Sequence, residues 1–289
     1  MSNQQVKWLF LLVLALIWGS SFILIKRGLV GLTPIQLGAA RISFSALFLL
    51  VIGFGSLREI RHHQWKYIAL TSLFGTFIPA FLFAIAQTQI SSSISSILNS
   101  LTPLNTLIIG VFAFGLTFKR AQLIGVVIGL MGTLVLIING ALAHPNQNYT
   151  YTLLVLLASL CYATNVNLIK KYLSDVKPLS ITTGNFLVML IPALLILFST
   201  GISKQLQEEA VKESMAFVLI LGIIGTGIAN ILFYKLIQIS TPVFATSVTY
   251  LIPVVAIGWG LYDHESLTLT QGIGASIILF GVYLSSKNK

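Results

Sequence analysis

Three polar residues recur every four positions within one apolar stretch of this chain: Thr226, Asn230 and Tyr234. Residues four apart lie on the same face of an α-helix, so the three residues predict one polar stripe. Their hydroxyl and amide groups can hydrogen-bond a polar solute, or they can hold one helix against another. Both interpretations stay open, because polar atoms among apolar residues need a partner in either case.

Two prolines, Pro103 and Pro253, also interrupt apolar runs that contain polar residues. A proline removes a helical hydrogen bond, and the freed carbonyl is tolerated within a membrane where a neighbouring group or a cavity satisfies it. The polar residues near the prolines are Asn99, Ser100, Thr102, Asn105, Thr246, Thr249 and Tyr250. The pattern predicts paired helix irregularities beside a polar cavity, and paired packing kinks are the alternative.

Two pairs of residues and one charged residue are further candidates for a polar site. Trp18 with Ser21, and Tyr162 with Asn165, are each spaced three apart. Trp18 lies about ten residues into its apolar run, roughly 15 Å at the rise of an α-helix, which is too deep for an interfacial aromatic belt. Arg41 is the one charged residue clearly inside an apolar run. Such a charge either takes part in function or ties helix carbonyls together.

The residue types on which enzymes and metal sites depend are missing from the apolar runs. No Asp or Glu falls in them, the four His residues fall between them, and the single cysteine, Cys161, is typical of a packing residue. We therefore expect no catalysis, no metal and no cofactor. The same absence predicts a neutral, zwitterionic or weakly anionic substrate, moved by facilitated diffusion or exchange.

The composition indicates that these apolar runs are surrounded by membrane lipid. Of 289 residues, 56% are hydrophobic and 8% are charged, whereas soluble domains carry about 25% charged residues. Because a spanning helix needs roughly 20 apolar residues, the chain has room for about ten spans. The net charge of +10 is dispersed in short groups between the runs, which argues against nucleic-acid binding.

We predict an all-α integral membrane protein with ten transmembrane helices. The predicted spans are residues 8–25, 34–55, 66–86, 94–116, 121–138, 151–169, 179–200, 215–234, 243–261 and 269–285. With the N-terminus inside, twelve Lys and Arg residues fall in the cytoplasm and four outside. The positive-inside rule therefore predicts a protein of the cell (inner) membrane with both termini cytoplasmic.

The two halves of the chain resemble each other. At an offset of 144, the matches are Trp18 with Tyr162, Lys26 with Lys170, Pro34 with Pro178 and Arg41 with Asn185. At an offset of 150, they are Gly75 with Gly225, Thr76 with Thr226, Phe83 with Phe233 and Pro103 with Pro253. We expect repeats at residues 1–140 and 150–289, joined by an outside loop at 141–149. Five spans per repeat predict that the second repeat is inserted in the opposite direction.

The matched segments resemble a known family. The sequence WGSSF at residues 18–22, followed by Lys26, Pro34 and Arg41, is similar to the start of the EamA domain of the drug/metabolite transporter superfamily. DHESLT at residues 263–268 and the run at residues 271–282 resemble its end. In the first half, Lys119 and Arg120 stand where the family usually has an acid like Glu265. The resemblance implies ten helices in two repeats and the export or exchange of small metabolites.

We therefore expect a secondary transporter that exports small amphiphilic metabolites, with amino acids or related compounds as the best guess. The expected partners are a small-molecule substrate and membrane lipid, in a monomer or homodimer, without nucleic acid. Alternating access at a cavity between the repeats would move the solute. The alternatives are a drug or nucleotide-type metabolite exchanger, an intramembrane enzyme and a non-transporting scaffold.

Overall fold

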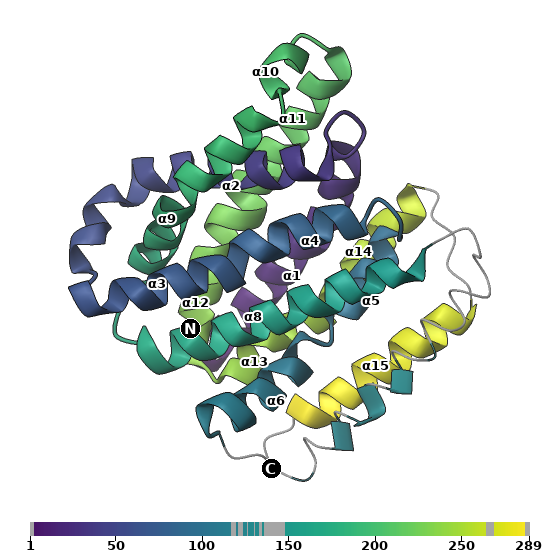
Figure 1. Cartoon of the computed structure of the whole chain (residues 1–289). Coiled ribbons are helices and arrows are strands. Elements are labelled where there is room, and N and C mark those ends of the chain that lie inside the picture. The colour runs from purple at the N-terminus through teal and green to yellow at the C-terminus, as the bar shows by residue number, and fades with distance from the viewer. Residues whose placement is uncertain are drawn as a thin grey trace.

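The computed structural model describes residues 3–116, 148–263 and 269–286, together with residues 120, 124–125, 127–129, 131–132 and 135. Within these residues, every regular element is helical (Figure 1). Eight helical segments there are long and apolar enough to cross a membrane. The predicted span at 121–138 falls mostly on residues outside the described part of the chain.

The helices follow the predicted spans closely, with several spans built from two or three segments. Before residue 117, the α-helices are α1 (Asn3–Gly28), α2 (Pro34–Gly53), α3 (Trp65–Ser72), α4 (Ile78–Ala86), α5 (Ser92–Asn99) and α6 (Thr102–Phe114). After residue 148, they are α8 (Thr152–Tyr172), α9 (Pro178–Ser199), α10 (Ile202–Gln205), α11 (Glu209–Gly222), α12 (Ala229–Ile239), α13 (Pro242–Thr246), α14 (Ile252–Tyr262) and α15 (Leu269–Ser286). We call the two groups the first and second halves.

Equivalent positions of the two halves begin their helices in the same way. The Ser91 hydroxyl accepts a hydrogen bond from Ile94 N at 3.2 Å at the start of α5, and Thr241 accepts one from Phe244 N at 3.2 Å at the start of α13. Each cap satisfies a backbone N–H that the first helical turn leaves free. The offset of 150 found in the sequence therefore corresponds to matching local structure.

The prolines coincide with paired helix breaks, as predicted. Pro103 is the second residue of α6 and Pro253 is the second residue of α14. A proline is tolerated in the first turn of a helix, because its missing N–H would have no intrahelical acceptor there. In the second half, the short 3₁₀ helix η6 (Ser247–Tyr250) precedes the break.

The first helix of each half packs against the other half. α1 contacts α11, α12 and α14, whereas α8 contacts α3, α4 and α6. The equivalent helices α2 and α9 pack against each other. These contacts are reciprocal, so each half packs on the other and neither half forms a separate core.

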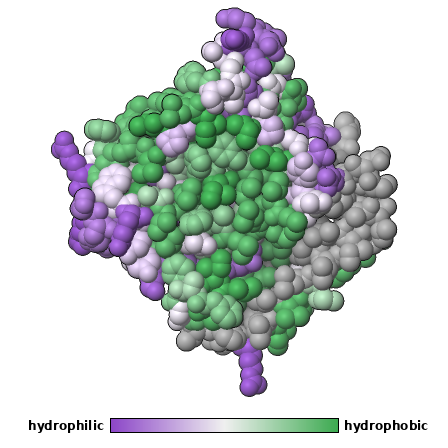
Figure 2. Space-filling view, in the orientation of Figure 1, coloured by the Kyte–Doolittle hydropathy of each residue, from purple (hydrophilic) through white to green (hydrophobic). Residues whose placement is uncertain are grey.

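Many of the exposed side chains are large and apolar, as expected of a surface in contact with lipid. Figure 2 shows hydrophobic residues covering the middle of one face, with hydrophilic residues gathered towards its margins. Large apolar side chains point outwards, such as Val51 at 85% and Phe112 at 86% exposure. Polar side chains such as Ser45, Thr183 and Asn185 are fully buried instead. This distribution is typical of a protein whose polar groups line its interior and whose apolar groups face acyl chains.

Candidate functional site

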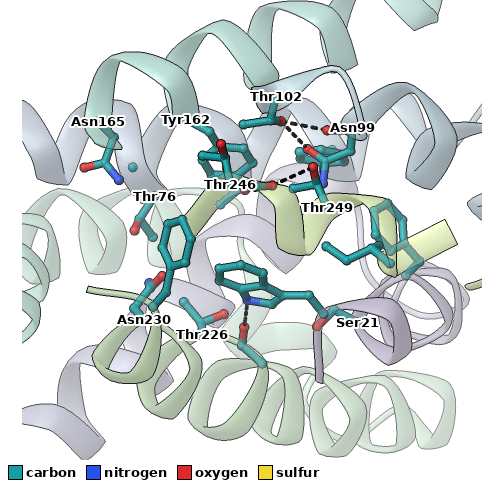
Figure 3. Close-up of a pocket in the computed structure, with 18 of the residues that line it drawn as sticks. Ser21, Thr76, Asn99, Thr102, Tyr162, Asn165, Thr226, Asn230, Thr246 and Thr249 are labelled. Carbon is teal, nitrogen blue, oxygen red and sulfur yellow. Dashed lines mark hydrogen bonds between the residues drawn. The ribbon is translucent and has the colours of Figure 1, made fainter. Parts of the chain in front are cut away.

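A cavity lies between the two halves and brings together nine of the thirteen predicted site residues (Figure 3). In this view, Tyr162 and Asn165 lie on one side of the space, and Ser21, Thr226 and Asn230 lie on the other. The nine are Trp18, Ser21, Arg41, Thr76, Asn99, Tyr162, Asn165, Thr226 and Asn230. The first helix of each half contributes to the lining.

The cavity is large enough to hold more than an isolated water molecule. The space open to the centres of water-sized molecules is about 80 Å³, whereas one buried water needs roughly 10–15 Å³ on this measure. Polar lining atoms can therefore be satisfied by several waters or by a solute.

Two π-helical turns line the cavity at equivalent positions: η3 (Leu73–Phe77) and η5 (Ile223–Ile228). Such turns are rare and occur frequently at functional sites. The indole Nε1 of Trp18 donates a hydrogen bond to Gly225 O at 3.0 Å within η5. Thus α1 of the first half is held directly against the π-helical turn of the second.

The glycines of these turns allow close approach across the halves. A Cβ atom on Gly75 would lie 2.7 Å from the Asn165 carboxamide, and one on Gly225 would lie 2.8 Å from Ser21 Oγ. Ser21 and Asn165 are themselves equivalent at the offset of 144. The two π-helical turns therefore meet the first helices of the opposite halves in the same manner.

Aromatic rings form the apolar part of the wall. Trp18 packs on Phe233 with ring centroids 4.9 Å apart, and Tyr162 packs on Phe83 at 6.0 Å. All four residues line the cavity, and the two pairs are again equivalent across the repeat. Aromatic pairs of this kind provide a large, defined apolar surface. The lining thus combines hydrogen-bonding groups with a hydrophobic surface, which suits an amphiphilic solute.

The polar groups of the lining differ in how far the protein satisfies them. Arg41 Nε donates to Thr226 Oγ1 at 2.7 Å, and the Thr226 hydroxyl donates to Leu221 O at 3.0 Å. Thr76 Oγ1 and Asn165 Oδ1 have no hydrogen-bond partner among the described residues. Buried polar atoms of this kind call for a ligand or water.

Asn185, the repeat equivalent of Arg41, is used differently. It is hydrogen-bonded to Thr71 Oγ1 at 3.0 Å and to Tyr234 Oη at 3.1 Å, and it does not line the cavity. Asn185 and Tyr234 are both fully buried. The polar stripe is therefore divided. Thr226 and Asn230 line the cavity, whereas Tyr234 lies one turn further along α12, where its side chain interacts with Asn185 of α9 and Asn165 of α8.

The remaining three predicted site residues, Pro103, Tyr250 and Pro253, do not line the cavity. The prolines shape the helix breaks beside it, and the neighbouring threonines reach the lining in their place. These are Thr102, Thr246 and Thr249, whose hydroxyls donate to backbone carbonyls of the preceding turn at 2.7–3.0 Å. The sequence showed that these threonines lie near the prolines, but not that their side chains point into the cavity.

Sequence reasoning missed the aromatic wall formed by Phe22, Phe83 and Phe233. A phenylalanine in a membrane helix is usually a packing or lipid-facing residue, so its type alone gave no signal. The match of Phe83 with Phe233 across the repeat was the available clue, since few residues of the third and eighth predicted spans match in both identity and position.

Comparisons with known proteins agree with this architecture. The model of a family described as the EamA-like transporter family matches residues 6–138 and 150–287. The "Uncharacterized inner membrane transporter YedA" of Escherichia coli K12 is 26% identical over 286 residues, which cover 96% of this chain and 90% of the relative. The "Probable amino-acid metabolite efflux pump" of Salmonella typhimurium LT2 is 25% identical, covering 95% and 92%.

A solved structure described only as a crystal structure of a protein has a similar fold. It superposes with a TM-score of 0.71 at 17% identity, covering 99% of this chain and 97% of the other. At that identity, the likeness shows the fold alone. Together with the family match, these findings identify a multi-pass membrane transporter and not an enzyme.

Proposed function

Because the chain belongs to the EamA-like transporter family, we propose that it exports small amphiphilic metabolites, with amino acids or related compounds as the leading candidates. The observation that carries this proposal is the cavity between the halves, whose lining joins unsatisfied polar atoms to an aromatic wall. The similarity to a protein named as a probable amino-acid metabolite efflux pump supports the same substrate class.

We further propose that the chain forms ten transmembrane helices in two inverted repeats, with both termini in the cytoplasm. The reciprocal packing of α1 and α8 supports this arrangement, because related halves can exchange conformations and expose one site to either face in turn. The distribution of Lys and Arg residues supports the orientation. The repeats would extend over residues 1–140 and 150–289.

The test is counterflow in proteoliposomes that contain the purified protein and a pool of unlabelled amino acids and related metabolites. Labelled members of the pool are added outside, and we expect protein-dependent accumulation of at least one of them. Accumulation no greater than in empty liposomes, across the whole pool, would contradict a carrier. If the protein is instead a drug or nucleotide-type metabolite exchanger, we expect accumulation of label only when such compounds are included in the pool.

Tyr234 allows the site to be separated from the surrounding structure. In Tyr234→Phe, we expect the free energy of unfolding to fall by about 1–3 kcal/mol, because the buried Asn185 carboxamide loses a partner. Transport by the protein that remains folded should fall less than in a cavity variant, since Tyr234 does not line the cavity and reaches it only through Asn165. Thermal unfolding and counterflow of the same preparation measure both effects. Asn230→Ala is the matched variant in the cavity, and it should reduce transport while preserving stability.

A further inference from the structure

Among the described residues that line the cavity, one carries a formal charge: Arg41, through its guanidinium. Arg41 is 9% exposed and lines the cavity from α2. Among the described residues that form the lining, none is an Asp or a Glu. An isolated charge in a low-dielectric interior is costly unless it is paired and hydrogen-bonded. The site therefore carries an uncompensated positive charge.

The protein provides a hydrogen-bond acceptor for only some of the N–H donors of this guanidinium. Its Nε donates to Thr226 Oγ1 at 2.7 Å, which is its one hydrogen bond to the described residues. The Nη groups keep their N–H donors available for another acceptor. The planar donor fork of an arginine matches the two oxygens of a carboxylate, and the resulting charge-assisted bonds are among the strongest in proteins.

Comparison of the halves supports a role for Arg41 other than holding helices together. Its equivalent, Asn185, is engaged by Thr71 and Tyr234 and is withdrawn from the cavity. Thr76, the equivalent of Thr226, is left without a hydrogen-bond partner in the described part of the chain. The Asn185 carboxamide is thus satisfied by one group from each half and lies away from the cavity, whereas Arg41 presents a cation to the shared space.

We propose that Arg41 binds the carboxylate of the transported solute, so that the site prefers organic acids with one negative charge and an apolar body. This inference rests on the proposed function and narrows its substrate class from amino acids to related acids that carry the carboxylate without the ammonium group. A zwitterion would bring an ammonium group for which the lining offers no carboxylate, and a cation would be repelled. The rings of Trp18, Phe83 and Phe233 would contact the apolar body.

The experiment uses the full-length protein in detergent and three probes that share a phenylpropyl body. These are 3-phenylpropionate, which is anionic; 3-phenylpropionamide, its neutral isostere; and phenylalanine, a zwitterion. Isothermal titration calorimetry measures the affinity of each probe. We expect 3-phenylpropionate to bind about tenfold or more tightly than either other probe, as is typical of hydrogen bonds to charged groups.

Substitutions then assign this preference to Arg41. Arg41→Gln should remove the preference for 3-phenylpropionate over its amide, and Arg41→Lys should retain a weaker preference, because lysine keeps the charge without the planar fork. Lys204→Gln is the matched control, since it removes one positive charge from an exposed position. It should bind all three probes as the wild type does. If Arg41→Gln fails to fold, the wild type and Arg41→Lys still test the ranking.

Equal binding of the acid and the amide by the wild type, or no binding of any probe, would overturn the inference. A preference that survives in Arg41→Gln would also overturn it. Transport is measured separately by counterflow of the same probes in proteoliposomes. If binding shows an Arg41-dependent preference but none of the probes is transported, the anion site is upheld and the proposed function is contradicted. If the probes are transported but the amide is preferred over the acid, the proposed function is upheld and the anion site is contradicted.

Discussion

Replacing Trp18 with alanine is expected to lower the free energy of unfolding by about 3–5 kcal/mol and to remove most of the transport activity. The substitution deletes the ring that packs on Phe233 at 4.9 Å and the indole N–H that donates to Gly225 O at 3.0 Å. Both partners belong to the second half, so the loss falls on the contact that aligns the halves around the cavity. Chemical unfolding and counterflow measure the two effects.

Two further variants show which part of Trp18 matters. Trp18→Phe keeps an aromatic ring but leaves Gly225 O without its donor, so we expect about 1–3 kcal/mol of destabilisation. Trp8→Ala is the matched control on the same helix, since Trp8 is 52% exposed. A loss of stability in Trp8→Ala as large as that in Trp18→Ala would show that α1 is sensitive everywhere, and would argue against a specific contact.

Replacing Gly19 with valine is expected to destabilise the fold by about 1–3 kcal/mol or to prevent its assembly. A Cβ atom at this position would lie 2.5 Å from Val255 Cβ and 3.1 Å from Ile252 O. Neither atom is the end of a flexible side chain, so α1 and α14 would have to separate. The same two helices are also joined at their ends, because Lys26 and Arg27 of α1 both form ion pairs with Asp263, the residue after α14. The yield of monodisperse protein and its thermal unfolding provide the readout.

Gly258→Val makes the same substitution where nothing lies within 4 Å of the added Cβ. We expect it to fold and transport as the wild type does. If both glycine variants behaved alike, the close approach of α1 and α14 would not be required for the fold. The difference between them therefore measures the contact itself and not the general cost of valine in a helix.

The sequence predicted the helical fold well because its determinants are local. Apolar runs of the right length predicted the spans, and Pro103 and Pro253 marked breaks that the structure contains. The π-helical turns η3 and η5 were not predicted, since their residues are also compatible with a regular α-helix. Only the matched pairs Gly75-Thr76 and Gly225-Thr226 indicated that something is repeated there.

The site was predicted in part, because residue type identifies polar positions but not their partners. Arg41 was predicted to lie inside a span without an acid, yet nothing indicated Thr226 as the acceptor 185 positions away. Tyr234 belongs to the same stripe as Asn230, but Asn185 engages it from another helix. Glu265 and Lys119, which bear on the departure from the family pattern, lie outside the described residues.

Alternating access requires that one cavity between the halves opens to each face of the membrane in turn. It can be tested in a Cys161→Ala background, which removes the single native cysteine. Ala80→Cys places a thiol in the cavity at the repeat equivalent of Asn230, and Leu47→Cys places one at a 52% exposed position on the outer surface of α2. Each variant must first retain counterflow activity.

A membrane-impermeant maleimide is then added to right-side-out or to inside-out vesicles, and labelling is followed by mass spectrometry. We expect the thiol of Ala80→Cys to react from both faces, and the thiol of Leu47→Cys to react from neither, because it faces lipid. Reaction of the Ala80→Cys thiol from one face only, or from neither, in protein that still transports would contradict alternating access.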